Sequence, residues 1–313
     1  MNSNNYIISR LGADNIADLD KLHYAVYQKQ VPRDFFLKKY DTAYTGIQYN
    51  GFIAYNSHKM PVAFYGVIPC LIVCSNEVIM AAQSADTMTH PGYRSRGLFV
   101  QLAELTFELC RITGIRLLFG FPNQNSLPGF VNKLGWCVKE YMDCFLVPVK
   151  CLPLERLSIK LPFLKGIYNY YVKQVIKKYY GPGKGIANPV LVDGFDGILR
   201  NNDYLEYKTY SVTHVIEIDG VAFWIKINNG LIIGDIAGIT DYNLKTLMDK
   251  LLKIGRRVGV KQIQFHTSPC TKLHTLFIQQ YEAIRSFPVI LKDLDGGVPA
   301  DNLKFAFADI DIF

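Results

Sequence analysis

The sequence predicts an α/β (α+β) fold made of two domains, each with a mixed central sheet flanked by helices. Extended and helical patterns alternate through both halves of the 313 residues. Half of the residues are hydrophobic and only 19% are charged, so the chain can bury two cores. Three elements of the first half also recur in the second half, each the same number of residues later. A strand begins near residue 115 and again near residue 261, one helix begins at residues 97 and 243, and another begins at residues 125 and 271. This spacing indicates an internal duplication.

The first half contains the clearer elements. We expect a strand, two helices and three antiparallel strands, in that order, over residues 6–11, 13–27, 32–44 and 52–88. The next helix follows Gly97 and ends at Gly114, and its apolar stripe consists of Leu98, Leu102, Leu105, Leu109 and Ile112. A buried strand, a short helix and a long strand complete this half, over residues 115–121, 125–134 and 136–149.

The second half repeats this order after a connecting segment. A strand over residues 231–239 leads into a helix over residues 242–254, for which Thr240 or Asp241 is the expected cap. A strand, a helix and two further strands follow, over residues 260–267, 271–283, 287–291 and 303–310. We therefore divide the chain into a first domain, a connector and a second domain, over residues 1–150, 151–185 and 186–313.

The connector carries the positive charge of the chain. The net charge is +7, and residues 150–184 hold eight Lys or Arg residues against one acid, Glu155. The rest of the chain is therefore neutral, and the charge gives no information about its substrate. Apolar residues at helical spacing predict an amphipathic helix in the connector, formed by Leu164, Ile167, Tyr168, Tyr171, Val172, Val175, Ile176 and Tyr179.

Two interpretations of this helix are open. It would either lie on an anionic membrane surface or grip nucleic acid, or pack its apolar face on the protein and leave its lysines in solvent. We favour packing, and we expect no nucleic-acid partner, because a stripe rich in Tyr and without Trp suits contacts within a protein.

Composition narrows the class of protein further. No segment reaches the roughly 18 uninterrupted apolar residues of a membrane-spanning helix, and residues 1–5 lack the features of a secretion signal. The seven cysteines are an odd number without a Cys-x-x-Cys pair. We therefore expect a cytoplasmic protein with reduced thiols and no metal site.

The residues from Thr89 to Val100 carry the strongest chemical signal. An extended run enters a short turn that is rich in Arg and Gly, and the turn opens a helix. The first turn of a helix has unpaired N–H groups, and the helix dipole places about half a positive charge there. Arg94 and Arg96 add two permanent cations. The segment therefore predicts a binding site for a diphosphate.

The run Arg94-Ser95-Arg96-Gly97-Leu98-Phe99 resembles the pyrophosphate-binding signature of the GNAT superfamily of acyl-CoA N-acyltransferases, Arg/Gln-x-x-Gly-x-Gly/Ala. Phe99 stands where the signature has a small residue. The flanking runs His90-Pro91-Gly92-Tyr93 and Lys133-Leu134-Gly135-Trp136 are also similar to the family. The repeated layout resembles bacterial proteins in which a catalytic GNAT domain precedes a degenerate one, so the resemblance implies two GNAT-like domains here.

The resemblance implies that acetyl-CoA is a co-substrate held by the first domain. Main-chain N–H groups from Ser95 to Phe99 would bind its diphosphate, and the main chain of Met88 and Thr89 would pair with its pantetheine arm like another strand. Asn125 would hydrogen-bond the same arm. The residues expected to bind the cofactor are therefore Met88, Thr89, Arg94, Ser95, Arg96, Gly97, Leu98, Phe99 and Asn125.

Three residues are candidates for catalysis. Asp86 is a carboxylate in a run that is otherwise apolar or small, so it acts as a base, binds the ammonium of the substrate or has a structural role. His90 either titrates during catalysis or belongs to a turn. The C-terminal carboxylate of Phe313 would reach the active site, as it does in some tandem family members. Val131 occupies the position of the tyrosine that protonates the leaving thiolate in many members.

The resemblance thus implies an acetyl-CoA-dependent N-acetyltransferase. A primary amine of a small molecule would enter between the domains and attack the thioester directly, and an amino sugar of surface-polysaccharide synthesis is one such substrate. Two alternatives stay open. One is a FemABX-like transferase that uses aminoacyl-tRNA, which would fit the basic connector. The other is a catalytically inactive binding protein on the GNAT fold, which would fit Val131 and Phe99.

Overall fold

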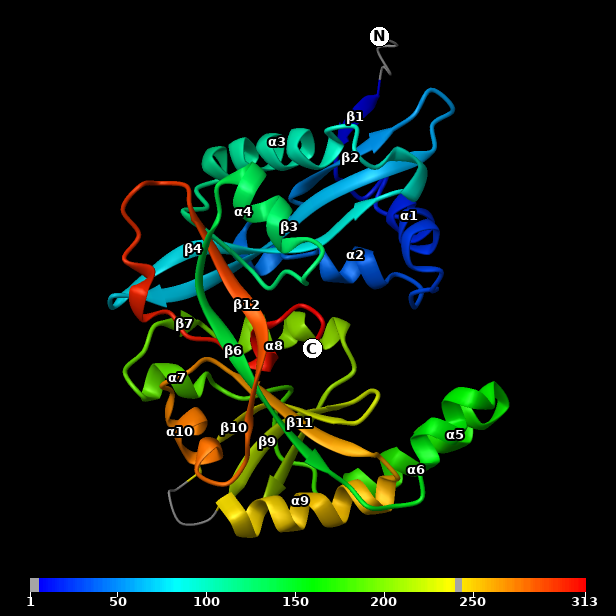
Figure 1. Cartoon of the computed structure of the whole chain (residues 1–313), viewed down its shortest axis with the longest axis vertical. Coiled ribbons are helices and arrows are strands. Elements are labelled where there is room, and N and C mark those ends of the chain that lie inside the picture. The colour runs from blue at the N-terminus through cyan, green and yellow to red at the C-terminus, as the bar shows by residue number, and fades with distance from the viewer. Residues whose placement is uncertain (1–5, 240–243) are drawn as a thin grey trace. The chain divides into compact units, whose positions relative to one another are not determined.

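A computed structural model describes residues 6–239 and 244–313 of the chain (Figure 1). The chain forms two compact units. Unit 1 consists of Met1–Glu140 and Pro288–Asp301, and unit 2 consists of Tyr141–Phe287 and Asn302–Phe313. Each unit has a mixed sheet with helices on its faces, as the sequence predicts. No helix among the described residues has both the length and the apolar character that crossing a membrane requires.

The sheet of unit 1 is antiparallel except at one pair. Its order is β1-β2-β3-β4-β5-β12, and β4 runs parallel to β5. The strands are β1 (Ile7–Arg10), β2 (Gly51–Tyr55), β3 (Pro61–Cys74), β4 (Glu77–Thr89), β5 (Leu117–Gly120) and β12 (Ala283–Asp293). The parallel pair requires a crossover, which the helix after Gly97 provides.

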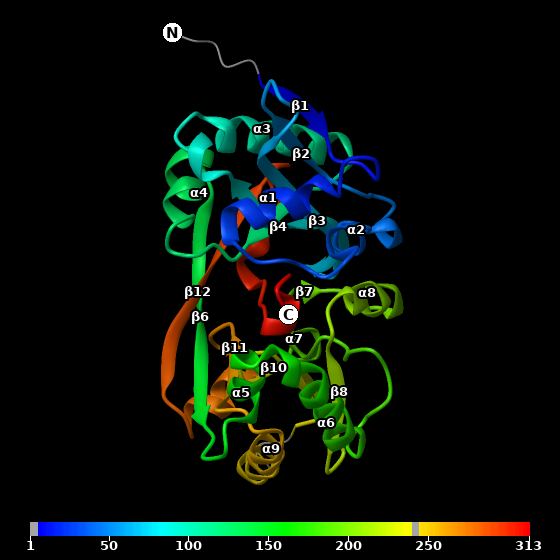
Figure 2. The ribbon, with the colours of Figure 1, turned by 90° about the vertical axis from the view of Figure 1, so that its right-hand side faces the viewer.

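Helices cover both faces of this sheet. Helix α3 (Leu98–Ile112) packs on β2 and β3, while α1 (Asp18–Tyr27) packs on β3 and β4 from the opposite face (Figures 1 and 2). The other helices are α2 (Phe35–Lys39) and α4 (Leu127–Leu134). The buried face of α3 contacts Tyr65 and Ala82 in one core. It is rotated from the expected stripe, so that Ile112 is exposed while Phe107 and Cys110 are buried.

Unit 2 has the same arrangement. Its sheet has the order β6-β11-β10-β9-β8, in which β10 and β11 are parallel and joined by α9 (Leu244–Val258). The strands are β6 (Cys137–Pro148), β8 (His214–Ile218), β9 (Val221–Ile227), β10 (Leu231–Ala237) and β11 (Gln262–Thr267). The remaining elements are α5 (Leu154–Lys160), α6 (Lys165–Lys177), α7 (Pro189–Val192), β7 (Gly197–Ile198), α8 (Asn202–Tyr207) and α10 (Lys272–Ile278).

Each unit takes one strand from the other half of the sequence. The strand that follows α4 is β6, and it pairs with β11 of unit 2, where Val147 lies opposite Ile263. The strand that follows α10 is β12, and it pairs with β5 of unit 1, where Ile290 lies opposite Gly120. This exchange explains why the units differ from the division expected at residues 150 and 185.

The connector also differs from the expected single helix. Residues 151–185 belong to unit 2 and form α5, the 3-10 turn Pro162–Leu164 and α6. Val172 and Ile176 of α6 are buried in the core of unit 2, and Tyr168, Val175 and Tyr179 pack against it. One apolar face of α6 therefore packs on the protein, as we expected.

The strand expected over residues 303–310 is wrong. This segment contains the 3-10 turn Phe307–Asp309, in which a carboxylate oxygen of Asp309 accepts the N–H of Ala306 at 2.8 Å. Consecutive residues are buried here, Ala306 and Ala308 as well as Phe307, so the segment lacks the alternating burial of a two-faced strand. The expected cap at Thr240 or Asp241, and the expected helix start at residue 242, lie outside the described residues.

Candidate functional site

The end of β4 leaves part of its backbone unpaired on one side. Pairing with β5 ends where Gln83 lies opposite Phe119. Beyond this point β4 continues to Thr89 and pairs only with β3 among the described strands. Met88 is buried, and Thr89 lines an adjoining cavity. The main chain of both residues is therefore placed where an extended ligand could add to the sheet.

The turn after β4 directs the chain into α3. His90 caps the 3-10 turn Pro91–Tyr93, because its Nδ1 accepts the N–H of Gly92 at 3.2 Å. Ser95 and Gly97 then adopt left-handed backbone angles, with φ of 61° and 80°. A Cβ atom at Gly97 would meet no atom within 4 Å. Gly97 is therefore required by its backbone angle rather than by crowding.

The main-chain donors of this turn are available. Among the residues that the structure describes, no hydrogen bond engages the N–H groups of Ser95, Arg96 or Gly97. The next N–H groups belong to the first turn of α3, where Gln101 is the first to donate back, to the carbonyl of Gly97 at 3.1 Å. Unpaired donors and the positive end of the α3 dipole thus coincide, which is the arrangement that binds phosphate groups.

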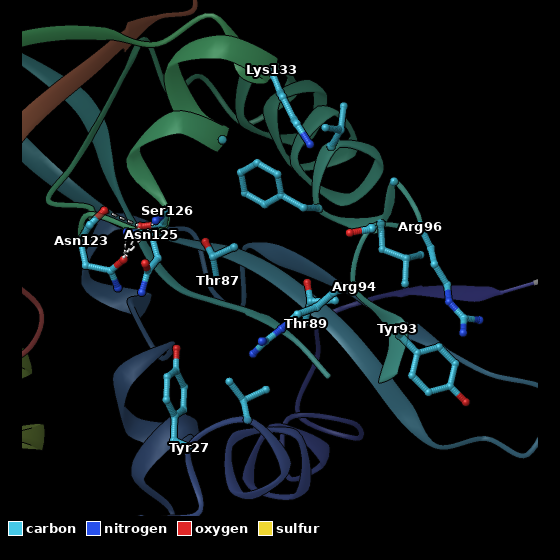
Figure 3. A pocket seen from close by; sticks show the side chains of 17 residues that line it. Tyr27, Thr87, Thr89, Tyr93, Arg94, Arg96, Asn123, Asn125, Ser126 and Lys133 are labelled. Atoms are coloured by element: carbon cyan, nitrogen blue, oxygen red, sulfur yellow. Dashed lines mark hydrogen bonds between the residues drawn. The ribbon is translucent and has the colours of Figure 1, made fainter. Parts of the chain in front are cut away.

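A cavity of about 650 Å³ lies at this turn (Figure 3). Thr87 and Thr89 line it from β4, Tyr27 lines it from α1, and the residues before and within α4 close it. Its lining consists of Val26, Tyr27, Thr87, Thr89, Tyr93, Arg94, Ser95, Arg96, Gly97, Leu98, Phe99, Val100, Asn123, Asn125, Ser126, Gly129 and Lys133. All nine residues that we expected to bind the cofactor, except the buried Met88, are in this lining.

The two arginines of the turn behave differently. Arg94 points into the cavity in Figure 3 and is exposed. Arg96 points away from it, donates to the carbonyl of Gly92 at 2.9 Å and to the hydroxyl of Tyr6 at 3.2 Å, and lies over the ring of Tyr93. Arg94 is therefore the cation presented to a ligand, while Arg96 holds the turn together.

Phe99 and the asparagines before α4 complete the pocket. The ring of Phe99 packs 5.5 Å from that of Phe130 and lies against Gly129, so the large side chain fills space beside α4. Asn123 accepts the N–H groups of Asn125 and Ser126 at 2.9 and 3.0 Å, which fixes the start of α4. The side chain of Asn125 lies at the cavity beside them (Figure 3).

Two of the lining residues that were not among the expected site residues add groups that can act on a ligand. Lys133 projects from α4 and adds a second cation, and Tyr27 points its hydroxyl into the cavity from α1 (Figure 3). Lys133 lies in the segment that resembles the family, so the motif offered a signal for it. Tyr27 lies far from the motif in sequence, and only the packing of α1 on β3 and β4 places it here.

Asp86 is engaged by a buried lysine rather than placed in the cavity lining. It occupies a bulge of β4, with φ of 49°, where the register with β3 shifts between Phe64 and Gly66. One carboxylate oxygen lies 2.6 Å from the ammonium of Lys39 and accepts the hydroxyl of Tyr40 at 3.1 Å. Of the interpretations open for Asp86, these contacts favour the structural one.

The other two catalytic candidates also lie outside the cavity lining. His90 caps the turn through Gly92 and packs edge-on against Tyr93. Phe313 belongs to unit 2, where its buried ring packs against Trp224 and over Gly234. The lining residues that the structure describes carry hydroxyls, amides and cations, but no carboxylate, imidazole or thiol. Their chemistry suits an anionic ligand. Among the described residues no group of three metal-ligating side chains is found.

Comparison with known proteins identifies a family that matches the first part of the chain. Residues 8–138 match the acetyltransferase (GNAT) domain family, a segment that contains the turn and the cavity. A search of curated proteins found no match to the sequence. The fold is similar to that of a GCN5-related N-acetyltransferase from Kribbella flavida, with a TM-score of 0.57 and 12% identity over 93% of this chain and 72% of that one. A GCN5-related N-acetyltransferase from Anabaena variabilis gives the same TM-score and identity over 93% and 73%.

Proposed function

We propose that this chain is an acetyl-CoA-dependent N-acetyltransferase acting on the primary amine of a small molecule, because residues 8–138 match the acetyltransferase (GNAT) domain family. One observation carries the proposal. The unpaired N–H groups of Ser95, Arg96 and Gly97 stand at the start of α3, in the wall of a cavity of about 650 Å³. Amino sugars are the substrate class that the family resemblance suggests.

The residues present fit acetyl-CoA. The space beside Gly97 is open, so a diphosphate can approach the backbone closely. Arg94 and Lys133 supply positive charge to the phosphate groups from two sides of the cavity. The unpaired edge of β4 near Met88 and Thr89 would hold the pantetheine arm, and Asn125 would donate to it.

Acetyl-CoA supplies the activated acyl group as a thioester. The protein holds the two reactants in position and supplies the proton for the leaving thiolate. The amine must be neutral to react, yet the described cavity lining holds no carboxylate or imidazole to deprotonate it. The proton would therefore pass to water. The phenolic O–H of Tyr27 holds a proton at the cavity, and we assign to it the role of the tyrosine that Val131 replaces. Asp86 and His90 would support β4 and its turn.

Release of free thiol from acetyl-CoA tests the proposal. The protein is incubated with acetyl-CoA and a panel of primary amines that includes amino sugars, and thiol release is followed with a chromogenic disulfide. We expect release that depends on the amine, with the acetylated amine seen by mass spectrometry. Binding of acetyl-CoA without transfer to any amine would favour a binding protein, and transfer from aminoacyl-tRNA instead would favour the FemABX-like alternative.

A further inference from the structure

The segment from α5 to α6 exposes large apolar side chains that the core of unit 2 does not use. Phe163, Ile167 and Tyr170 are 74%, 67% and 65% exposed. Leu152 and Ile159, before and within α5, are 78% and 61% exposed. In Figure 1, α5 and the start of α6 stand out from the sheet of unit 2. Several apolar side chains this exposed in one short segment indicate a contact surface.

The exposed residues form a second apolar face on α6 and the turn before it. Ile167 and Tyr170 are three residues apart in α6, so they lie along one side of the helix, and Phe163 precedes them in the 3-10 turn Pro162–Leu164. The face that packs on the core of unit 2 is formed by Tyr168, Val172, Val175, Ile176 and Tyr179. These residues lie on the opposite side of the helix. Packing within unit 2 therefore accounts for one apolar face of α6 and leaves the other uncovered.

Cations surround this second face, and no exposed acid in the segment opposes them. Lys173 and Lys177 of α6 and Lys178 at its C-cap are exposed along the rest of the helix. The only acid within residues 150–184 is Glu155, which is buried, and burial raises its pKa. The hydroxyl of Tyr171 donates to the carbonyl of Arg257 at 2.9 Å, so the last turn of α9 brings the exposed Arg256 and Arg257 close by.

We propose that the exposed face of the α5–α6 segment binds the surface of an anionic lipid membrane. Apolar side chains would enter the boundary between headgroups and acyl chains, and the lysines beside them would contact the anionic headgroups. Charge complementarity favours this partner, because a surface of apolar and cationic groups without exposed acids matches a negatively charged apolar layer. The acetyltransferase domain would then work beside the membrane.

Flotation with lipid vesicles tests the proposal. The full-length chain is mixed with vesicles of phosphatidylcholine alone or of phosphatidylcholine with phosphatidylglycerol. We expect it to float with the anionic vesicles and not with the neutral ones, and added salt should weaken the binding. Replacing Lys173, Lys177 and Lys178 together by Gln should reduce binding by roughly tenfold or more. The double variant Phe163→Ser/Ile167→Ser should reduce it to a similar extent.

Matched controls test whether binding depends on this surface in particular, rather than on the total charge of the protein or on exposed apolar side chains elsewhere. Replacing the exposed Lys29, Lys38 and Lys245 by Gln removes the same charge elsewhere and should leave binding within about twofold. The variant Ile112→Ser/Val192→Ser removes two apolar side chains that are 74% and 85% exposed outside the segment, and it should also bind normally. Circular dichroism melting checks that every variant folds.

Three results would overturn the proposal. The first is equal flotation with neutral and anionic vesicles, or none with either. The second is a dimer in solution that Phe163→Ser/Ile167→Ser disrupts, which would assign the face to a second copy of the chain. The third is a gel shift with RNA that needs the three lysines, without vesicle binding.

Discussion

The carboxylate of Asp86 lies 2.6 Å from the ammonium of Lys39, whose side chain is only 2% exposed. Asp86 itself sits in a bulge of β4, two residues before Met88, whose main chain would hold the cofactor. The ion pair thus ties α2 to the strand that leads into the turn before α3. A buried cation without its partner is strongly unfavourable, so this contact favours a structural role for Asp86.

The variant Asp86→Asn should therefore lose more folding stability than catalytic turnover. We expect a loss of about 2 kcal/mol in the free energy of unfolding, because the buried ammonium of Lys39 loses its ion pair with the Asp86 carboxylate. Lys39→Met/Asp86→Asn should recover most of it, since both charged groups are then removed. Denaturant melts measure stability, and turnover per folded molecule should stay within a few-fold of wild type. Turnover reduced a hundredfold in a variant of normal stability would instead make Asp86 the catalytic base.

Turnover should depend on the protonation of the substrate. Because the described cavity lining holds no carboxylate or imidazole, kcat/KM should rise with pH until the amine reaches its own pKa. Two amines of different basicity should then give profiles displaced by the difference between their pKa values. One inflection near neutral pH, shared by both amines, would mean that the protein provides a base.

Tyr27→Phe should lower kcat by about tenfold or more, because the proposed role of the Tyr27 hydroxyl is to protonate the leaving thiolate. The affinity for acetyl-CoA should stay within about twofold, because the ring remains in place. Tyr24→Phe, an exposed tyrosine of the same helix outside the cavity lining, is the matched control. An unchanged kcat in Tyr27→Phe would remove this residue from the mechanism.

Stability of unit 2 should fall in mild acid because of His266. Its buried ring packs against Phe287 and Phe307, and burial lowers its pKa to about 4. The unfolded chain binds a proton below a pKa near 6.5 that the folded chain does not bind until about pH 4, so stability decreases as the pH falls through this window. The loss should be on the order of 2 kcal/mol by pH 4.5. His266→Gln should flatten this dependence in urea melts, and an equally steep slope in the variant would assign it to other groups.

The sequence predicted most elements of unit 1 and the position of the turn that opens α3. Gly97, the unpaired start of α3 and the end of β4 are local features, and local patterns report them well. The strand with which another strand pairs is not determined by the local sequence, so the exchange of β6 and β12 between the units could not be predicted. The strand predicted for residues 303–310 was wrong for a related reason, because the buried Asp309 accepts the N–H of Ala306 and closes a 3-10 turn.

The side chains of the site show the same limit. The sequence presents Arg94 and Arg96 as equals, but only three-dimensional packing turns Arg96 back onto Gly92 and Tyr93. The interpretation of Asp86 depended on Lys39, and that of the cavity on Tyr27, both far earlier in the chain. Composition correctly located the basic segment, while only the structure showed that α6 has two apolar faces.

Calorimetric titration with acetyl-CoA tests the central claim most directly, with Arg94→Ala and Arg96→Ala compared at equal stability. Arg94→Ala should weaken binding by roughly 10- to 100-fold, because a charge-assisted contact to phosphate is lost. Arg96→Ala should weaken it only a few-fold, since that guanidinium is held by Gly92 and Tyr6. Undetectable binding to the wild-type protein, or equal affinity in wild type and Arg94→Ala, would contradict the account.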